Sequence, residues 1–309
     1  MARPMAKGLG VVGLLCGLLL GGCQSPSVVS TGDDEMPKVV STTTIIADLT
    51  EAIASEQIQH TSLLQPGVDP HIYEPVPQDS IALENADLIL YNGYNLEPGL
   101  IRLIEAVGQR ARRVAVAEFI APLNTEENGE IEPDPHVWGN VQNAIVMAEV
   151  IRDELIALSP DDRQIFTDNA EQLIEELEKL HIWIGEQIAT IPSDRRYLVT
   201  THDAFQYYAA AYGLTVPGTL IGISTEEQPS AQTVRNLAEE IRRHRVPAIF
   251  AETTLNPQLI RAVAEEAGVE LAPQELYSDS IGAPGSQGDS YVRMMEANTR
   301  AIVEALGDN

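Results

Sequence analysis

An amphipathic segment near the middle of the chain places the strongest constraint on its fold. Between residues 160 and 192, apolar side chains recur every three or four residues, the pattern of a helix with one buried face. The stripe consists of Phe166, Ala170, Leu173, Leu177, Leu180, Ile184, Ile188 and Ile191. Ser159 and Pro160 suit a helix start, and Pro192 suits its end. Such a helix is about 48 Å long, enough to run the length of a molecule with two lobes.

Strand-like and helix-like segments alternate on both sides of this helix. Before it, β-rich runs lie at 38–44, 59–64, 87–92 and 113–117, with helical patterns at 46–55, 78–86, 97–109 and 140–158. After it, strands at 197–201, 215–221, 248–251 and 270–272 accompany helices at 204–212, 231–244, 257–267 and 291–306. Strands separated by helices predict βαβ units and parallel sheets.

We therefore expect an α/β fold in which two (β/α) lobes, each with a parallel four-stranded sheet, are joined by one long backbone helix. The expected boundaries are 38–159 for the N-terminal lobe, 160–192 for the linker helix and 193–309 for the C-terminal lobe.

The first 37 residues predict export and lipid attachment. Two basic residues precede an uncharged, mostly apolar run at 9–22, which is shorter than the ~20 residues that span a bilayer. The run ends in Leu-Gly-Gly directly before Cys23 and resembles a bacterial lipobox. We expect residues 1–22 to be a lipoprotein signal peptide, Cys23 to be the lipidated N-terminus and residues 23–37 to be a flexible tether. The only other cysteine is inside the apolar run, so no disulfide and no cysteine-ligated metal is expected.

The charge of the chain excludes one class of partner. It has 19 Lys and Arg against 46 Asp and Glu, a formal net charge of −27. Such a chain lacks the basic surface that binds phosphate backbones, so we expect no nucleic-acid partner. Contact with the membrane is expected through the lipid anchor only, and the protein is expected to be a monomer.

Three histidines follow predicted strands in a similar way. The tripeptide Asp-Pro-His occurs twice, ending at His71 and at His136, and His202 follows the strand at 197–201. In open parallel sheets, ligands bind at the carboxyl ends of the strands. Asp279, after the last strand of the second set, is the matching carboxylate. Three imidazoles and a carboxylate suit a first-row divalent metal, which predicts one ion held by two residues from each lobe.

Three further carboxylates are candidates for orienting these imidazoles: Asp203, Glu252 and Asp289. Asp203 could equally cap the following helix, which is the preferred interpretation. Four protein ligands would leave no open position for a catalytic water, so an enzyme is not expected. A zinc hydrolase is therefore the less favoured alternative, and a metal-dependent adhesin or structural lipoprotein is the other.

The sequence resembles the metal-binding receptors of ATP-binding-cassette importers for zinc, manganese and iron, the cluster A-I family, which includes lipoproteins once labelled adhesins. The resemblance runs from about residue 39 to 306. It is carried by DPHIYEP at 69–75, DPHVWGN at 134–140, THDAF at 201–205, TEEQPSA at 225–231, DSIG at 279–282 and GDSY at 288–291. It implies metal ligands at His71, His136, His202 and Asp279, a permease and its ATPase as partners, and a location outside the plasma membrane, which is the periplasm if the cell is Gram-negative.

Two features bear on which metal is carried. Manganese members of the family commonly have glutamate at the position of His202, so the histidine favours zinc. Zinc members commonly carry a histidine-rich loop before the second ligand, whereas the loop at 124–134 is short and acidic, which favours manganese. The metal stays open between zinc and manganese, with iron a third candidate and zinc ahead on coordination chemistry alone.

Overall fold

The computed structural model describes residues 36–127 and 130–307. The predictions for the signal peptide at 1–22, for Cys23 and for nearly all of the tether at 23–37 lie outside the described residues. Within the described ranges, no helix combines the length and the apolar composition needed to cross a membrane.

The N-terminal half, residues 36–158, is built on a parallel four-stranded sheet, as predicted. Its strands are β1 (Lys38–Ser41), β2 (Gln59–Ser62), β3 (Leu88–Tyr91) and β4 (Arg112–Ala115), in the spatial order β2-β1-β3-β4. The helices of this half are α1 (Thr44–Ala54), α2 (Pro77–Glu84), α3 (Pro98–Val107) and α4 (Val141–Leu158). All strands therefore end on the same edge of the sheet, and the loops that follow them meet there.

Alternating side chains divide this sheet between two apolar layers. Val40 and Ile89 pack with residues of α2 and α3, whereas Val39 and Leu88 pack with residues of α1 and α4. Successive side chains of a strand point to opposite faces, so the two layers follow directly from strand geometry. Both faces of the sheet are covered, as expected for parallel strands.

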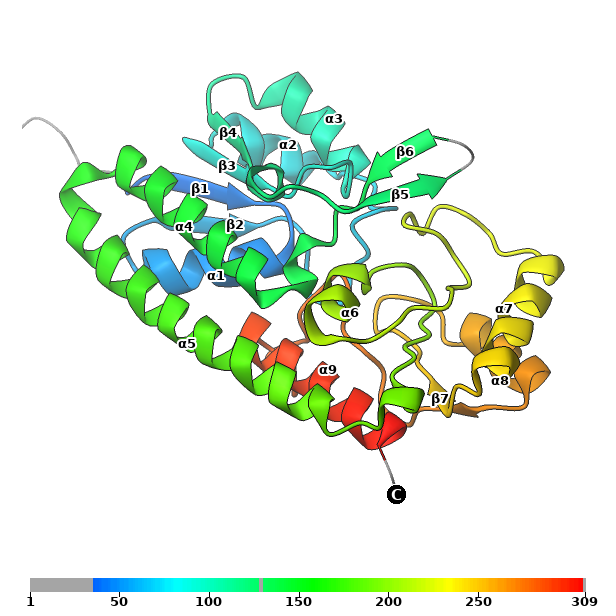
Figure 1. The fold of residues 1–309 in the computed structure, drawn as a ribbon. Coiled ribbons are helices and arrows are strands. Elements are labelled where there is room, and N and C mark those ends of the chain that lie inside the picture. Colours follow the sequence, from blue (N-terminus) through cyan, green and yellow to red (C-terminus); the bar gives the residue numbers. More distant parts are fainter. Residues whose placement is uncertain (1–35, 128–129, 308–309) are drawn as a thin grey trace, which may run out of the picture. The chain divides into compact units, whose positions relative to one another are not determined.

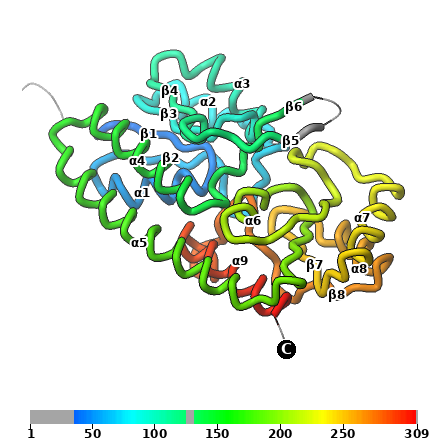
Figure 2. The backbone as a smooth tube through the Cα atoms, in the orientation of Figure 1, coloured from blue at the N-terminus to red at the C-terminus, as the bar shows by residue number. Residues whose placement is uncertain are grey.

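The long helix is α5 (Arg163–Ala189), preceded by a 3-10 turn at Pro160–Asp162. Every member of the predicted stripe is buried. The start differs from the prediction, because the Ser159 hydroxyl donates to the Asp162 carboxylate (2.6 Å) instead of capping a backbone N–H. The helix packs against α1 and α4 of the N-terminal half and against α9 (Tyr291–Leu306) near the C-terminus (Figure 1, Figure 2).

The C-terminal half, residues 193–307, departs from the predicted second four-stranded sheet. It contains two short parallel strands, β7 (Ala248–Ile249) and β8 (Glu270–Leu271), and isolated bridges Tyr197↔Thr215 and Glu252↔Leu276. Backbone bonds from Leu198 N to Thr215 O and from Phe250 N to Val199 O place four parallel segments side by side, in the same order as the first sheet. The helices are α6 (Gln206–Tyr212), α7 (Ala231–His244), α8 (Gln258–Ala267) and α9.

The predicted strands at 197–201 and 215–221 fail because their backbone groups have other partners. The Thr200 hydroxyl donates to the carbonyl of His202 (2.8 Å), and the carbonyl of Thr201 accepts from both Leu220 N and Ile221 N. Hydroxyl side chains that bond to nearby backbone compete with the ladder of a sheet. The segment therefore leaves the sheet early and turns toward the loop that contains His202.

The segment at 124–134, expected to be a loop, is instead an antiparallel hairpin. Its strands β5 (Asn124–Glu127) and β6 (Glu130–Pro133) pair with Asn124 opposite Pro133. The hairpin ends at Pro133, directly before the second Asp-Pro-His tripeptide.

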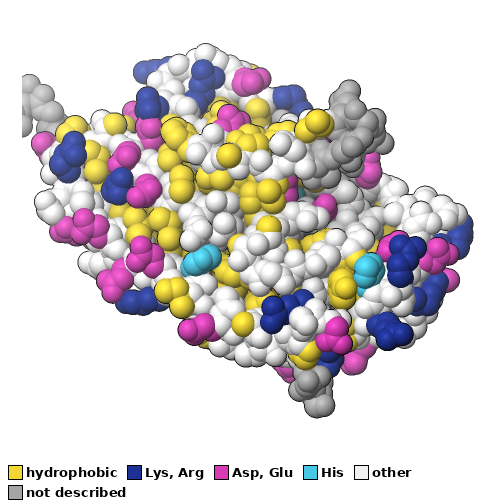
Figure 3. Space-filling view, viewed as in Figure 1, with side chains coloured by type: hydrophobic (Ala, Val, Ile, Leu, Met, Phe, Trp, Pro, Cys, Tyr) yellow, Lys and Arg dark blue, Asp and Glu magenta, His cyan; other side chains and the backbone are white. Residues whose placement is uncertain are grey.

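Charged side chains are mixed on the surface. On the face shown in Figure 3, Lys and Arg gather over α7, with acidic side chains among them. Arg243 forms an ion pair with Glu240 (2.7 Å), which also lies 3.6 Å from His244. The basic residues of α7 are thus partly neutralised within their own helix.

Candidate metal centre

The four predicted ligands are brought together in one buried cluster. One potential ligand atom from each residue lies within 4.8 Å of the others. We call His71, His136, His202 and Asp279 the histidine–aspartate cluster. Their exposed fractions run from 0% for His136 and His202 to 3% for His71. Two members come from each half of the chain. His136 directly follows the β5–β6 hairpin, and the other three members follow segments of the parallel sheets, as the strand-end rule predicts.

The two Asp-Pro-His tripeptides form the same local turn. Asp69 Oδ1 accepts a hydrogen bond from the backbone N–H of His71 (2.9 Å), and Asp134 Oδ1 accepts one from the backbone N–H of His136 (2.9 Å). A carboxylate that bonds to the backbone two residues ahead stabilises a turn. The aspartate two residues before each histidine is therefore the sequence signal for this turn.

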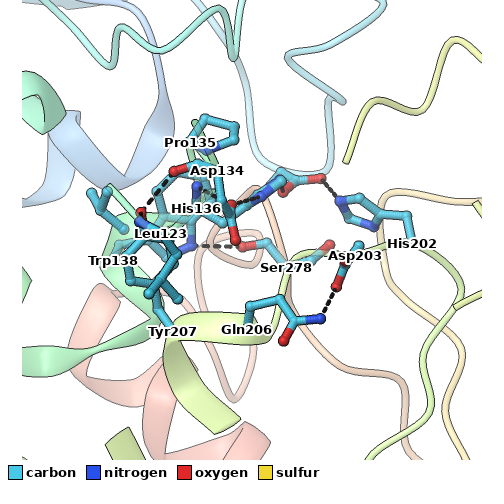
Figure 4. A network of polar contacts seen from close by, with 12 residues as sticks. Leu123, Asp134, Pro135, His136, Trp138, His202, Asp203, Gln206, Tyr207 and Ser278 are labelled. Atoms are coloured by element: carbon cyan, nitrogen blue, oxygen red, sulfur yellow. Dashed lines mark hydrogen bonds and ion pairs between the residues drawn. The ribbon is translucent and has the colours of Figure 1, made fainter. Parts of the chain in front are cut away.

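His136 is held from several directions. Its Nδ1 lies 2.8 Å from Asp134 Oδ1 (Figure 4), and Asn92 Nδ2 donates to the carbonyl of Pro135 (3.0 Å). Helix α4 begins five residues further on, at Val141, and the side chain of its N-cap, Asn140, accepts from Gln142 N. The loop between the hairpin and α4 is therefore fixed at both ends.

Glu252 holds His202, as the sequence suggested. Its Oε1 accepts from the backbone N–H of His202 (2.8 Å), and its Oε2 lies 2.5 Å from the imidazole Nδ1. Glu252 is 1% exposed and pairs with Leu276 in a parallel bridge. Leu276 lies three residues before Asp279. The buried carboxylate of Glu252 thus fixes both the backbone and the ring of His202.

The other two candidate orienting carboxylates have different partners. Asp203 accepts from the side chain of Gln206 (2.8 Å; Figure 4) and does not cap α6 directly, because the N-cap position is Phe205. Asp289 accepts from Gly285 N (2.8 Å) and pairs with Arg293 (2.7 Å). Both carboxylates thus bond to partners that are close to them in sequence, and not to an imidazole of the cluster.

Trp138 connects the two halves beside the cluster. Its Nε1–H donates to the carbonyl of Ser278 (3.0 Å; Figure 4), and its own carbonyl accepts from the Tyr291 hydroxyl (2.6 Å). The tryptophan that follows His136 therefore positions the residue that precedes Asp279.

The imidazoles present their Nε2 atoms to one another and to Asp279. His136 Nε2 lies 3.4 Å from Asp279 Oδ1, His202 Nε2 lies 3.3 Å from Asp279 Oδ2, and His71 Nε2 lies 3.3 Å from His136 Nε2. A carboxylate at Nδ1 fixes the neutral tautomer in which Nε2 has the free lone pair. For His136 and His202, that lone pair points into the cluster.

Several of these atoms lack a hydrogen-bond partner among the residues that the structure describes. They are both oxygens of Asp279 and Nε2 of His202. Buried polar atoms normally have a partner, so a group of converging acceptors without donors fits a bound cation. The geometry and the donor types are those of a site that could hold one divalent metal ion.

The cluster also shifts the pKa values of its members. Burial, reinforced by the charges of His136 and His202 and opposed by Asp279, lowers the pKa of His71 to about 3. Burial alone would lower the pKa of His202, but the carboxylates of Glu252 and Asp279 raise it well above its ordinary value. Burial alone would raise the pKa of Asp279, yet His202 and the other two imidazoles bring it below its ordinary range. The two carboxylates therefore favour the protonated form of His202, and the imidazoles favour the ionised form of Asp279.

A family model described as the periplasmic component A of the zinc-uptake complex, ZnuA, matches residues 39–305. The chain belongs to this family. The predicted membership of a family of metal receptors is thereby confirmed, and the same comparison disfavours the enzyme alternative.

Relatives and solved structures of the family match over almost their full lengths. The manganese-binding lipoprotein MntA of Halalkalibacterium halodurans is 33% identical over 95% of this chain and 96% of its own. The manganese transporter substrate-binding lipoprotein PsaA of Streptococcus pneumoniae is 33% identical over 94% and 96%. The periplasmic zinc-binding protein TroA of Treponema pallidum has a TM-score of 0.84 at 35% identity, covering 88% of this chain and 99% of its own. A manganese-bound periplasmic metal-binding protein of Candidatus Liberibacter asiaticus has a TM-score of 0.78 at 28% identity, covering 87% and 98%.

Proposed function

We propose that this protein is the solute-binding component of an ATP-binding-cassette importer, and that it captures one divalent transition-metal ion for a membrane permease and its ATPase. The ion is bound by the histidine–aspartate cluster. The observation that carries the proposal is the convergence of four buried donor residues within 4.8 Å, two of them oriented by buried carboxylates. Residues 38–159 and 193–309 act as the two lobes, with 160–192 as the linker helix, and the receptor works as a monomer.

The donor set favours zinc, while the names of the relatives point to both zinc and manganese. Three imidazoles and one carboxylate are borderline ligands that suit zinc in a four-coordinate site. The relatives MntA and PsaA are named for manganese, and TroA is named for zinc. We propose zinc or manganese as the cargo, with zinc ahead on coordination chemistry.

Titration of the metal-free protein tests the proposal. Calorimetric titration with Zn²⁺ and, separately, with Mn²⁺ should give one ion per chain, and elemental analysis of protein isolated from its native compartment should identify the same metal. A receptor must also return to the metal-free state, so a chelator should remove the ion while circular dichroism shows an unchanged fold. Absence of binding, or an ion whose removal unfolds the chain, would contradict a transport role.

Metal affinity should decrease as the pH is lowered. Glu252 and Asp279 raise the pKa of His202, so protons compete with the ion for this imidazole more strongly than for an ordinary one. The pKa of His71, about 3, and the lowered pKa of Asp279 mean that neither adds a proton near neutral pH. We expect the affinity to fall about tenfold for each pH unit below the pKa of His202. Calorimetry in buffers of different ionisation enthalpy checks the released proton, and an affinity independent of pH between about 5 and 8 would contradict imidazole ligation.

Lipid attachment is proposed at Cys23, outside the plasma membrane. The relatives MntA and PsaA are named lipoproteins, which supports it. Cys23→Ala should abolish incorporation of labelled fatty acid and move the protein from the membrane fraction to the soluble extracytoplasmic fraction. Cys16→Ala serves as the matched control, because that residue lies within the expected signal peptide, and it should leave lipid labelling unchanged.

A further inference from the structure

His71 has the weakest support of the three imidazoles. The Nδ1 atoms of His136 and His202 each face a buried carboxylate, Asp134 and Glu252 respectively. Among the described residues, Nδ1 of His71 has no hydrogen-bond partner. The position of this imidazole therefore depends on the backbone of its loop, and the loop is fixed chiefly by the carboxylate of Asp69.

The second oxygen of Asp69 is held from the other half of the chain. The hydroxyl of Thr225 donates to Asp69 Oδ2 at 2.7 Å, across 156 residues of sequence. Both side chains are buried, with 7% of each residue exposed. Asp69 thus joins two bonds, one to the backbone of His71 and one to Thr225. The Thr225–Asp69 bond contributes more to stability than an exposed bond would, because breaking it leaves a buried carboxylate oxygen without its donor.

A second bond between the halves holds the start of the same loop. The backbone N–H of Gly67 donates to Ser280 Oγ (2.8 Å), and Ser280 directly follows Asp279. The loop that contains His71 is therefore fixed at Gly67 and at Asp69, in both cases by residues of the C-terminal half. Thr225 is the cleaner probe of the two, because it is far in sequence from every member of the cluster.

Thr225 also lies at the end of a segment that borders the open side of the site. A pocket of about 590 Å³ is lined by His71 and Pro135 from the N-terminal half and by Ile223 and Ser224 from the C-terminal half. His71 is the member of the cluster that reaches this pocket, and it is also the most exposed member. The segment that forms one wall of the pocket is thus tied to the loop of His71 by the Thr225–Asp69 bond.

We propose that Thr225 is a positioning residue that holds His71 in the ligand set through Asp69, and so limits the rate at which the metal ion leaves. The inference rests on the proposed function. Loss of the bond loosens the loop at Asp69, while the Gly67–Ser280 bond still holds its start and the three other ligands stay in place, so the ion departs from a site with one weakened donor. Thr225 belongs to the C-terminal half, which makes retention of His71 conditional on contact between the halves.

The test measures release of Zn²⁺ from the loaded protein into excess colorimetric chelator by stopped flow. Thr225→Val has nearly the same shape but no hydroxyl, and it should release Zn²⁺ about tenfold faster, because a bond to a charged acceptor is lost. Thr225→Ser keeps the hydroxyl and should remain within about twofold of the natural protein. In an Asp69→Ala background, Thr225→Val should add nothing further, since the two residues act through one bond.

Thr299→Val is the matched control. Its buried hydroxyl bonds to the hydroxyl of Tyr208 (2.8 Å), away from the loop of His71, so the variant should lose thermal stability without faster release. The inference would be overturned if Thr225→Val released Zn²⁺ at the natural rate. It would also be overturned if Thr225→Val accelerated release from the Asp69→Ala variant as much as it does from the natural protein. Failure of the natural protein itself to bind Zn²⁺ or Mn²⁺ would instead refute the proposed function.

Discussion

Replacing His136 by alanine should lower the metal affinity by more than about a hundredfold, beyond the 10–100-fold typical of losing a residue that only orients a ligand. The imidazole is fully buried and is fixed by Asp134, and its Nε2 lies 3.4 Å from Asp279, so little else can take its place. Competition titration against a chelator of known affinity measures the change. Circular dichroism and thermal melts establish whether the variant is folded.

The control for this variant is His244→Ala. His244 lies at the end of α7, near Glu240, and 33% of its side chain is exposed, so its removal should leave the affinity unchanged. Where His136→Ala proves unstable, His136→Gln preserves most of the volume and should show the same loss. An unchanged affinity in a folded His136 variant would remove this residue from the ligand set.

Replacing Glu252 by glutamine should reduce the affinity about 10- to 100-fold and also change its pH dependence. The carboxylate accepts from both the backbone N–H and Nδ1 of His202, whereas an amide offers only one acceptor atom. One of the two bonds is lost, and with it the preference for the tautomer whose Nε2 lone pair faces the cluster.

The sign of the pH effect distinguishes this role from a merely structural one. Glu252 raises the pKa of His202, so its removal lowers that pKa and weakens competition by protons. The deficit relative to the natural protein should therefore be largest near about pH 8 and should narrow toward about pH 5.5. Asp203→Asn is the control, because its carboxylate bonds to Gln206 and not to an imidazole, and it should stay within about twofold. A deficit that is constant with pH would contradict electrostatic tuning by Glu252.

The sequence predicted those parts of the structure that depend on periodicity or on strand ends. The stripe from Phe166 to Ile191 identified α5 because a buried helical face repeats every three to four residues. The four members of the cluster were found because loops after parallel strands meet at one edge. Neither argument required knowledge of how distant segments pack.

The parts that were missed depend on individual hydrogen bonds. The hairpin β5–β6 was obscured by its acidic composition, although Asn-Gly at 128–129 is typical of two-residue hairpin connections. The second sheet is shorter than predicted because the Thr200 hydroxyl bonds to the nearby carbonyl of His202 and the Thr201 carbonyl accepts from Leu220 N and Ile221 N, which β-propensity does not report. The roles of Asp69 and Thr225 required a contact across 156 residues, which no local pattern contains.

The shared apolar core around α5 has a consequence for how this receptor unfolds. One continuous cluster of buried residues includes Val39 of β1, Leu177 of α5, Phe250 beside β7 and Ile302 of α9. Because residues of both halves form this core, unfolding of one half exposes apolar surface of the other. A single cooperative unfolding transition is therefore expected. An ion bound by four loops then stabilises the whole folded chain against unfolding. The size of this effect depends on the concentration of the free ion relative to its dissociation constant. Extracytoplasmic proteases should therefore degrade the metal-bound receptor more slowly than the metal-free receptor. The number of receptors at the membrane would then increase with the supply of metal.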